Sequence, residues 1–533
     1  MKKIILDQKD ISKIKRRRTF AIISHPDSGK TTITEKFLLL GKVIHQTGII
    51  KPKRFKKYTK SDWMDIERQR GISINTSVMS FSYLGYHINL LDTPGHEDFS
   101  EDTYRVLTAV DCCLIIIDGS KSVESRTEKL MKVARIKKIP IITFINKIDR
   151  NTYNYIKILD DIERKLKIFC VPINWPIGCG KLFKGIYDIY TNKISLFTQN
   201  SLIKVIKKNI FLNHNDFFLR KYLEKNEILQ LLEDLELIQS CYNSFNKRKF
   251  LQGKETPLFF GSALNNFGIK NILNKIVLWA PYPKIRNSLT RKVFSIEKYF
   301  SGFVFKIQAN MNPKHHDRIA FIRIVSGKYT EGMKFYHVRT KKIKIIKNAV
   351  NFIAGERCLI KKAYPGDIIG IHHMGDIKIG DTFTEGELIN FIEVPKFAPE
   401  YFKIIYLKDS FQQKKLLRGL KQLSEEGVIS FFQTFIDRSL ILGVIGKLQF
   451  DIVLERLKIE YHVVAKYRKT DISIIRWISS TNKKAFEIFK KENDLFLAYD
   501  NDNEIIFFTT NIFKLNLIKS QYKDIYFSEM KRF

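Results

Sequence analysis

Short apolar runs alternate with longer amphipathic stretches between residues 19 and 285. Five runs are rich in β-branched residues and end in polar or small residues: TFAIIS (19–24), HINLLDT (87–93), CCLIIID (112–118), PIITFINK (140–147) and PLFFGSA (257–263). Unbroken apolar strands separated by helices are typical of a parallel sheet that is covered on both faces. Ligands of such sheets bind at the carboxyl ends of the strands, so we expect a site there.

The pattern changes after a segment with two prolines and several charges, LWAPYPKIRNSLTRK (278–292), which we interpret as a linker. Short alternating runs with turn glycines then predict a small antiparallel barrel. A second proline-marked boundary, VPKFAPEYF (394–402), precedes two amphipathic helical stretches at 414–427 and 446–461. The chain is therefore predicted to be multidomain: an α/β domain over 1–285, an antiparallel β-barrel domain over 286–393 and a C-terminal α+β domain over 394–533.

Composition narrows the class of protein. At 533 residues the chain is too long for one core, so its length alone predicts about three or four domains. An apolar content of 44% is ordinary for a folded protein. It has no run of about 18 uncharged apolar residues, so no membrane span is predicted. The first 20 residues contain only a short apolar stretch and predict no secretory signal. Six scattered cysteines without a metal-type pair are typical of reduced thiols, and we expect a cytoplasmic protein.

The formal net charge of +37 has two explanations that stay open. A polyanionic partner such as RNA is one, because lysines and arginines placed on phosphates release counterions. The other is the amino-acid usage of an AT-rich genome, which also raises the lysine, isoleucine, asparagine and phenylalanine content. A lysine-rich run, KPKRFKKYTK (51–60), fits an RNA contact or a solvated loop.

The segment SHPDSGKT (24–31) follows the first apolar run and resembles a phosphate-binding loop. Gly29, Lys30 and Thr31 match the pattern, whereas Ser24 replaces its first glycine. Backbone N–H groups of residues 27–31 would hold phosphates at the start of a helix. Lys30 would reach the β- and γ-phosphates, and the Thr31 hydroxyl would bind Mg²⁺.

Three further motifs occur in order at later strand ends. DTPGH (92–96) supplies Asp92 for Mg²⁺, and Gly95, whose N–H would face the γ-phosphate. NKID (146–149) supplies Asp149, whose carboxylate can accept two hydrogen bonds from guanine that adenine cannot offer. Its Asn146 would connect the loops, and the stem of Lys147 would lie along the base. GSAL (261–264) would donate a backbone N–H to the guanine oxygen.

These motifs together predict a site for GTP or GDP with Mg²⁺. Ser73, in ERQRGISI (67–74), would complete the metal site with Thr31 and Asp92. His96 is the candidate catalytic residue, because an imidazole beside Gly95 could orient the attacking water. The predicted nucleotide-binding residues are Ser24, His25, Pro26, Asp27, Ser28, Gly29, Lys30, Thr31, Asp92, Thr93, Pro94, Gly95, His96, Asn146, Lys147, Ile148, Asp149, Ser262, Ala263 and Leu264.

The chain resembles the translational GTPases, and most closely those that act in termination. The resemblance runs from about residue 16 to the end and is carried by SHPDSGKTTITEK, KSDWM, ERQRGISI, LLDTPGHEDFSEDTYR, AVDCCL, WPIGCGKLFKG, GFVFKIQANMNPKHHDR, YPGDIIG, LSEEG and GKLQFD. It implies a P-loop GTPase domain followed by the barrel and the α+β domain. Members of the family tolerate a small residue at the position of Ser24. Ser73 stands where elongation factors carry threonine, which could loosen the closure of this segment.

The resemblance also implies the partners and the activity. A protein of this type would bind the ribosome as a monomer, eject a class I release factor after peptide release, and then hydrolyse GTP. The sarcin–ricin loop of ribosomal RNA, next to ribosomal proteins, would position His96, since the sequence shows no assignable arginine finger. No DNA or membrane partner is expected. The alternatives are a translocase or ribosome-protection factor similar to elongation factor G, for which 394–533 is short, and a non-catalytic RNA-binding protein on a relic core.

Overall fold

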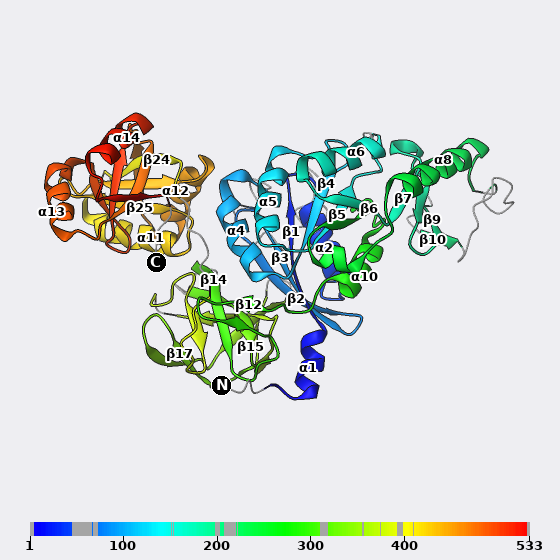
Figure 1. Cartoon of the computed structure of the whole chain (residues 1–533), viewed down its shortest axis with the longest axis horizontal. Helices are drawn as coiled ribbons and strands as arrows, with labels where there is room; N and C mark the ends of the chain where they lie inside the picture. Colours follow the sequence, from blue (N-terminus) through cyan, green and yellow to red (C-terminus); the bar gives the residue numbers. More distant parts are fainter. Residues whose placement is uncertain are drawn as a thin grey trace.

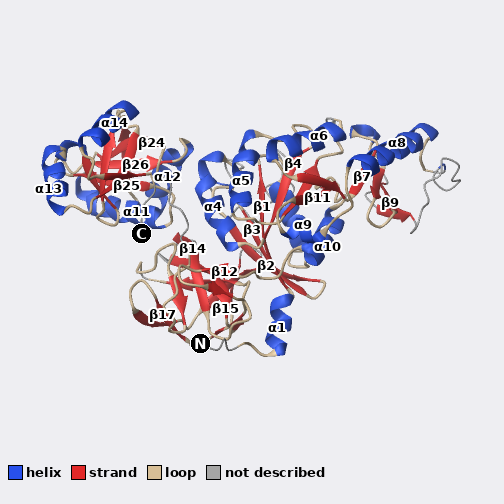
Figure 2. Cartoon of the chain, viewed as in Figure 1, coloured by secondary structure: helices blue, strands red, loops and turns tan. Residues whose placement is uncertain are grey.

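The computed structural model describes residues 5–44, 67, 73–150, 152, 154–197, 203–206, 220, 222–309, 318–353, 356–373, 375–391, 398–408 and 410–529. The lysine-rich run at 51–60 lies outside these residues. Figure 1 shows three regions that follow one another along the chain. Figure 2 shows that the first and third regions contain both helices and strands, whereas the second consists mainly of strands. In the described parts, no helix has the length and apolar character that crossing a bilayer requires.

The first region is built on a mixed sheet. Its described strands have the order β2-β3-β1-β4-β5-β11-β6, and only β2 runs antiparallel to its neighbour. The five predicted runs are confirmed as β1, β3, β4, β5 and β11. The strands are β1 Arg17–Ser24, β2 Ser77–Tyr83, β3 Tyr86–Asp92, β4 Cys112–Asp118, β5 Ile141–Asn146, β6 Phe169–Pro172 and β11 Glu255–Phe260.

Helices cover both faces of this sheet because side chains of a strand alternate between its faces. Phe20 and Ile22 of β1 pack in one core with α2 and α10, whereas Ala21 and Ile23 pack in the other core with α4, α5 and α6. The helices are α2 Lys30–Leu40, α4 Ser100–Ala109, α5 Ser125–Ile136, α6 Tyr155–Asp161 and α10 Ile269–Trp279. The predicted doubly covered sheet is confirmed, and the carboxyl ends of its parallel strands lie along one edge.

A second, smaller sheet extends the first region, and the hydrophobic pattern did not predict it. Its strands follow the order β10-β9-β8-β7 and are antiparallel. It lies with α8 at the right-hand end of the molecule in Figure 1. Trp175 of β7 donates through Nε1 to Asp234 of α8 at 2.9 Å and joins the two elements. The elements are β7 Asn174–Ile177, β8 Gly185–Asp188, β9 Lys193–Phe197, β10 Ile203–Ile206 and α8 Lys225–Cys241. The short helix α9 Lys247–Leu251, which follows, packs through Phe250 in the core of the main sheet.

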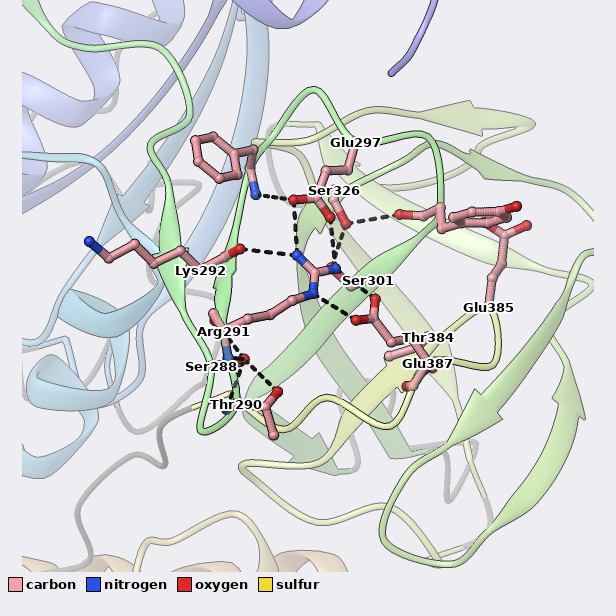
Figure 3. Close-up of polar contacts among 12 residues, drawn as sticks. Ser288, Thr290, Arg291, Lys292, Glu297, Ser301, Ser326, Thr384, Glu385 and Glu387 are labelled. Atoms are coloured by element: carbon pink, nitrogen blue, oxygen red, sulfur yellow. Dashed lines mark hydrogen bonds and ion pairs between the residues drawn. The ribbon is translucent and has the colours of Figure 1, made fainter. Parts of the chain in front are cut away.

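The segment interpreted as a linker is folded onto its neighbours. Its first residues end α10, and it then forms β12 Arg286–Asn287 and β13 Lys292–Val293. Arg291 holds this segment to the second region by ion pairs to Glu297 at 2.8 Å and to Glu387 at 2.6 Å (Figure 3). Two carboxylates on one planar guanidinium give a rigid attachment.

The second region is an antiparallel sheet, as the short strands predicted. Its described strands have the order β18-β17-β23-β14-β15-β22-β19-β20, and β16 pairs with β21 beside them. They surround a core that includes Val304, Ile322, Phe335 and Phe383. The strands are β14 Ser301–Ala309, β15 Arg318–Ser326, β16 Tyr329–Thr330, β17 Lys334–His337, β18 Lys342–Ile345, β19 Ala349–Ile353, β20 Glu356–Leu359, β21 Lys362–Ala363, β22 Ile368–His372 and β23 Thr382–Thr384.

The third region is α+β, as predicted. Its strands have the order β27-β24-β26-β25-β29-β30-β28-β31 among the residues described, and the two expected helices are α11 and α12. The elements are β24 Tyr401–Leu407, α11 Gln413–Glu425, β25 Ser430–Thr434, β26 Leu440–Val444, α12 Leu448–Tyr461, β27 Ala465–Arg468, β28 Ile474–Ser479, α13 Lys483–Glu492, β29 Leu497–Asp500, β30 Ile505–Thr509, α14 Ile512–Gln521 and β31 Tyr526–Ser528.

Buried polar contacts fasten the three regions to one another. Arg17 at the start of β1, which follows helix α1 Gln8–Lys15, donates through Nε to Asp367 of the barrel at 2.8 Å. At the third region, Glu426 receives a hydrogen bond from the Ala309 N–H of the barrel on its carboxylate. The Glu426 carbonyl accepts another from Arg105 of α4 at 3.1 Å. The end of α11 is therefore bonded to both other regions.

Candidate nucleotide-binding site

A cavity of about 350 Å³ opens at the carboxyl ends of β1, β3 and β5. It gathers residues from all four sequence motifs and Ser73. The lining residues are His25, Pro26, Asp27, Gly29, Lys30, Thr31, Thr32, Ser73, Gly95, His96, Asn146, Lys147, Asp149, Arg150, Ser262, Ala263 and Leu264. The other predicted residues, which do not line it, are Ser24, Ser28, Asp92, Thr93, Pro94 and Ile148.

The phosphate-binding loop takes its shape from Gly29, the residue before α2. Gly29 has a φ of 94°, in the region that disfavours L side chains. A Cβ atom here would also overlap the Nδ2 atom of Asn146. Ser24, in contrast, is 1% exposed, and its hydroxyl donates to the His25 carbonyl at 3.1 Å. A small side chain fits the buried end of β1, which explains how the loop forms without its first glycine.

A buried ion pair lies next to the phosphate-binding loop. Lys30 Nζ lies 2.5 Å from Asp92 Oδ1, and the two side chains are 6% and 2% exposed. Both residues begin or end regular elements, α2 and β3, so their backbones are fixed by the sheet and the helix. Thr93, the next residue, donates its hydroxyl to the Ile22 carbonyl at 2.7 Å. That bond holds the exit of β3 against β1 and keeps Asp92 beside Lys30.

Asn146 connects two of the loops around the cavity. Its Nδ2 donates to the Ser28 carbonyl at 2.7 Å, and its Oδ1 accepts from the Ala263 N–H at 2.9 Å. The side chain is 2% exposed, so both bonds are shielded from water. The loop after β1 and the loop after β11 are thus held to the end of β5.

Lys147 is held by a partner that the motifs did not predict. Its Nζ donates to Asp118 Oδ2 at 2.7 Å at the end of β4. Ser120 donates to the other carboxylate oxygen through its N–H at 2.9 Å and its hydroxyl at 2.6 Å. Burial raises the pKa of Asp118, but the hydrogen bonds from Lys147 and Ser120 hold it below its ordinary value of 3.8. The Lys147 stem is therefore fixed at the wall of the cavity.

Asp149 carries the unsatisfied acceptor of the site. Its Oδ1 atom is buried and has no hydrogen-bond partner among the described residues. A buried carboxylate oxygen without a donor costs free energy, so a ligand that supplies N–H groups would be bound here. Asp149 lines the cavity, which places this acceptor at its wall.

His96 and Ser73 also line the cavity. His96 comes from the segment after β3, and Ser73 comes from the segment before β2. The Asp98 N–H donates to His96 Nδ1 at 3.3 Å, so the neutral ring carries its own proton on Nε2. The segment that follows Ser73 is held by Glu67, whose Oε1 accepts from the N–H groups of Ile74 at 2.8 Å and Asn75 at 3.0 Å.

Sequence reasoning missed four residues around the site. Thr32 and Arg150 line the cavity, and their only sequence signal is their position directly after Thr31 and Asp149. Asp118 and Glu67 act through hydrogen bonds to Lys147 and to the segment after Ser73. The sequence contains two pairs of adjacent histidines. His315 and His316 lie outside the described residues, and His372 and His373 lie at the end of β22 and directly after it. No metal-ligating cluster of three or more His, Cys, Asp or Glu occurs in the part that is described.

Family models match three segments of the chain in order. The model described as elongation factor Tu GTP binding domain matches residues 15–282, and elongation factor G domain 2 matches residues 299–386. The model described as class II release factor RF3, C-terminal domain, matches residues 391–519. A crystal structure of a protein from Thermus thermophilus is similar with a TM-score of 0.69, covering 87% of this chain and 71% of that chain at 20% identity. That likeness supports the multidomain fold.

Curated relatives are similar over almost the whole chain. Peptide chain release factor 3 of Buchnera aphidicola subsp. Schizaphis graminum is 56% identical over 97% of this chain and 98% of its own length. The protein of the same name from Buchnera aphidicola subsp. Acyrthosiphon pisum (strain 5A) is 54% identical over 98% and 99%. The match of the third domain favours termination over the translocation alternative. The chain therefore belongs to the peptide chain release factor 3 family and is a guanine-nucleotide-binding GTPase of translation termination.

Proposed function

We propose that this protein binds GTP and Mg²⁺ in the cavity, binds the ribosome after peptide release, and promotes the dissociation of a class I release factor. The observation that carries the proposal is that one chain has both a cavity lined by phosphate-loop and base-side residues and a C-terminal domain that matches the release factor 3 type. As the resemblance implies, the protein would act as a monomer in the cytoplasm. The contact that stimulates hydrolysis would be the sarcin–ricin loop.

The base side of the cavity fits guanine. The buried Oδ1 of Asp149 lacks a donor among the described residues, and guanine presents a ring N–H and an amino group side by side. Adenine has no matching pair of donors, so it would leave the carboxylate unsatisfied. Lys147, held by Asp118 at 2.7 Å, supports the base from the side.

The phosphate side fits a magnesium-bound triphosphate. Thr31 and Ser73 line the cavity and offer hydroxyl oxygens, which Mg²⁺ takes as ligands in proteins. Asp92, which is paired with Lys30 and does not line the cavity, would hold the ion through water. When bound, the ion would neutralise charge that develops on the β- and γ-phosphates. Lys30 would place its ammonium on the phosphates, since it already lies at the cavity wall beside Asp92.

His96 would orient the water that attacks the γ-phosphate. Its Nδ1 accepts from the Asp98 N–H, which leaves the Nε2–H to bond a water molecule in the cavity that His96 lines. Only one arginine, Arg150, lines the described cavity, and it follows the base-side motif rather than the phosphate loop. Since no arginine among the described residues lies at the phosphates, hydrolysis would be slow until the ribosome completes the site.

The test measures the dissociation of a labelled class I release factor from post-termination ribosomes in the presence of this protein and GTP. Acceleration over the reaction without the protein supports the proposal, and no acceleration with continued GTP hydrolysis contradicts it. His96→Ala should keep GTP binding and lose ribosome-stimulated hydrolysis by about 10²-fold or more. His372→Ala, an exposed histidine at the end of β22, is the control and should keep both. Unchanged turnover of His96→Ala would remove His96 from the mechanism.

A further inference from the structure

The turn that carries His96 is bonded to the C-terminal domain. Asp98 lies in the short helix η1 Glu97–Phe99, directly after His96. Its Oδ2 atom accepts the Leu448 N–H at 2.6 Å, at the first residue of α12. Helix α12 has no side-chain cap from its own domain, and a carboxylate at a helix N-terminus is favoured by hydrogen bonding and by the helix dipole. Asp98 therefore caps a helix of another domain.

The backbone of the same residue holds His96. The Asp98 N–H donates to His96 Nδ1 at 3.3 Å. An Nδ1 atom that accepts this bond carries no proton, so Oδ1 of Asp98, 3.4 Å away, makes no hydrogen bond to the ring. Asp98 is thus bonded to the ring through its N–H and to α12 through its carboxylate. Any displacement of α12 along this bond moves the residue that holds the ring.

Apolar packing reinforces this connection. Phe99, the residue after Asp98, packs with Ile452 of α12 and with Ile74, the residue after Ser73. The side chains of Ile74, Phe99 and Ile452 are 3%, 5% and 0% exposed, so the contact excludes water. The start of α12 therefore touches both segments that line the cavity with His96 and Ser73.

Gly446, in the loop before α12, permits the close approach. A Cβ atom at this position would overlap the Cβ and Cγ atoms of Asp98. The absence of a side chain at Gly446 in the C-terminal domain therefore leaves the space that Asp98 of the GTPase domain occupies.

We propose that Asp98 is a positioning residue that transmits the seating of the C-terminal domain to the His96 ring. With α12 docked, the carboxylate is fixed and the ring stands at the cavity wall. When a partner shifts the C-terminal domain, the cap is lost and the ring loses its support. The C-terminal domain would therefore control hydrolysis from a distance. This inference rests on the proposed role of His96.

The test compares single-turnover GTP hydrolysis on saturating ribosomes with the affinity for GTP. Asp98→Ala should slow hydrolysis by about 10-fold through misplacement of the ring, with unchanged GTP affinity. Asp98→Asn should recover most of the rate, since its amide oxygen can still accept the Leu448 N–H. Gly446→Ala should slow hydrolysis similarly, although it lies in another domain. Glu97→Gln is the matched control, because Glu97 is the adjacent carboxylate and is half exposed.

The His96→Ala background separates positioning through the ring from other effects. There, Asp98→Ala and Gly446→Ala should add no further loss, because residues that act through one group are not additive. Nitrogen NMR of the histidine-labelled full chain should show His96 Nδ1 unprotonated, and its signal should shift in both Asp98→Ala and Gly446→Ala, because loss of the link to α12 displaces the backbone N–H that bonds Nδ1. Full activity of Asp98→Ala and Gly446→Ala, or additive losses, would overturn the inference while leaving His96 intact. An active His96→Ala would instead refute the proposed role of His96, and this inference with it.

Discussion

Asp149→Asn should change which base the cavity prefers. The wild-type carboxylate has a buried oxygen without a donor among the described residues, and guanine would supply two N–H groups. In the variant, one carboxylate oxygen becomes an amino group, which faces a guanine donor with another donor. Xanthine carries a carbonyl where guanine carries its amino group, so it can accept from the new amide.

The magnitude follows from the one bond that is lost, since the amide oxygen of asparagine can still accept the other. A hydrogen bond to a charged group contributes about 1.5–3 kcal/mol. That range corresponds to a loss of about 10- to 10²-fold in GDP affinity. The fold should be unaffected, because Asp149 makes no hydrogen bond through this oxygen to another described residue.

The assay is a competition titration of a fluorescent GDP analogue with GDP, xanthosine diphosphate and ADP, each with Mg²⁺. Asp160→Asn is the matched control, since it makes the same substitution at an exposed position of α6, close in sequence. The variant should lose GDP affinity and gain xanthosine diphosphate affinity, and the control should do neither. A GDP affinity equal to that of the wild type would refute the base-reading role of Asp149.

Two further predictions concern the loop and the contact between domains. Gly29→Ala should abolish nucleotide binding, because φ is 94° and the new Cβ overlaps Asn146. Isothermal titration measures the loss of binding, and a thermal melt should still show one cooperative unfolding transition, as expected of a folded variant. For Asp367, burial raises the pKa, but Arg17 holds it below 3.8, so the pair stabilises the fold above about pH 4 and loses that contribution as the pH falls further. Arg17→Met should reduce this acid-side slope in denaturation series across pH, since His87 and the Tyr364 N–H still lower the pKa of Asp367, and Arg16→Met, an exposed neighbour, should retain the full slope.

Local sequence patterns predict the parts of this fold whose signal is local. The strands of the main sheet are buried on both faces, so they occur as unbroken apolar runs and can be read directly. The four motifs follow those strands. Because parallel strands end at one edge of the sheet, residues as far apart in the sequence as Gly29 and Leu264 line one cavity. The topology brings them together without any signal beyond their order.

The elements that were missed have weaker patterns. Strand β2, SVMSFSY, mixes serines with apolar residues, and strands β7–β10 are short. Their pairing depends on partners elsewhere in the chain. Asp118 shows the same limit at the level of side chains: the run that ends in this aspartate marks a strand end, but nothing in it indicates that Lys147 will be its partner.

Contacts between domains are the hardest to predict from the sequence. A charged residue in an apolar run indicates that a partner of opposite charge exists, but it does not identify that partner. Arg323 lies in the apolar run of β15 and is paired with Asp111 of the first domain, both side chains being 2% exposed. An unpaired charge in such a place would be strongly destabilising, so burial of Arg323 requires a partner. The chain contains 55 acidic residues, however, and the sequence offers no means of choosing among them. Asp98 and Leu448, 350 residues apart, pose the same problem: each belongs to a recognisable segment, but their bond exists only where the C-terminal domain meets the first domain. Control of the His96 turn by α12 is therefore a property of domain placement, and it could be altered by substitutions at Gly446 that leave every nucleotide-binding motif unchanged.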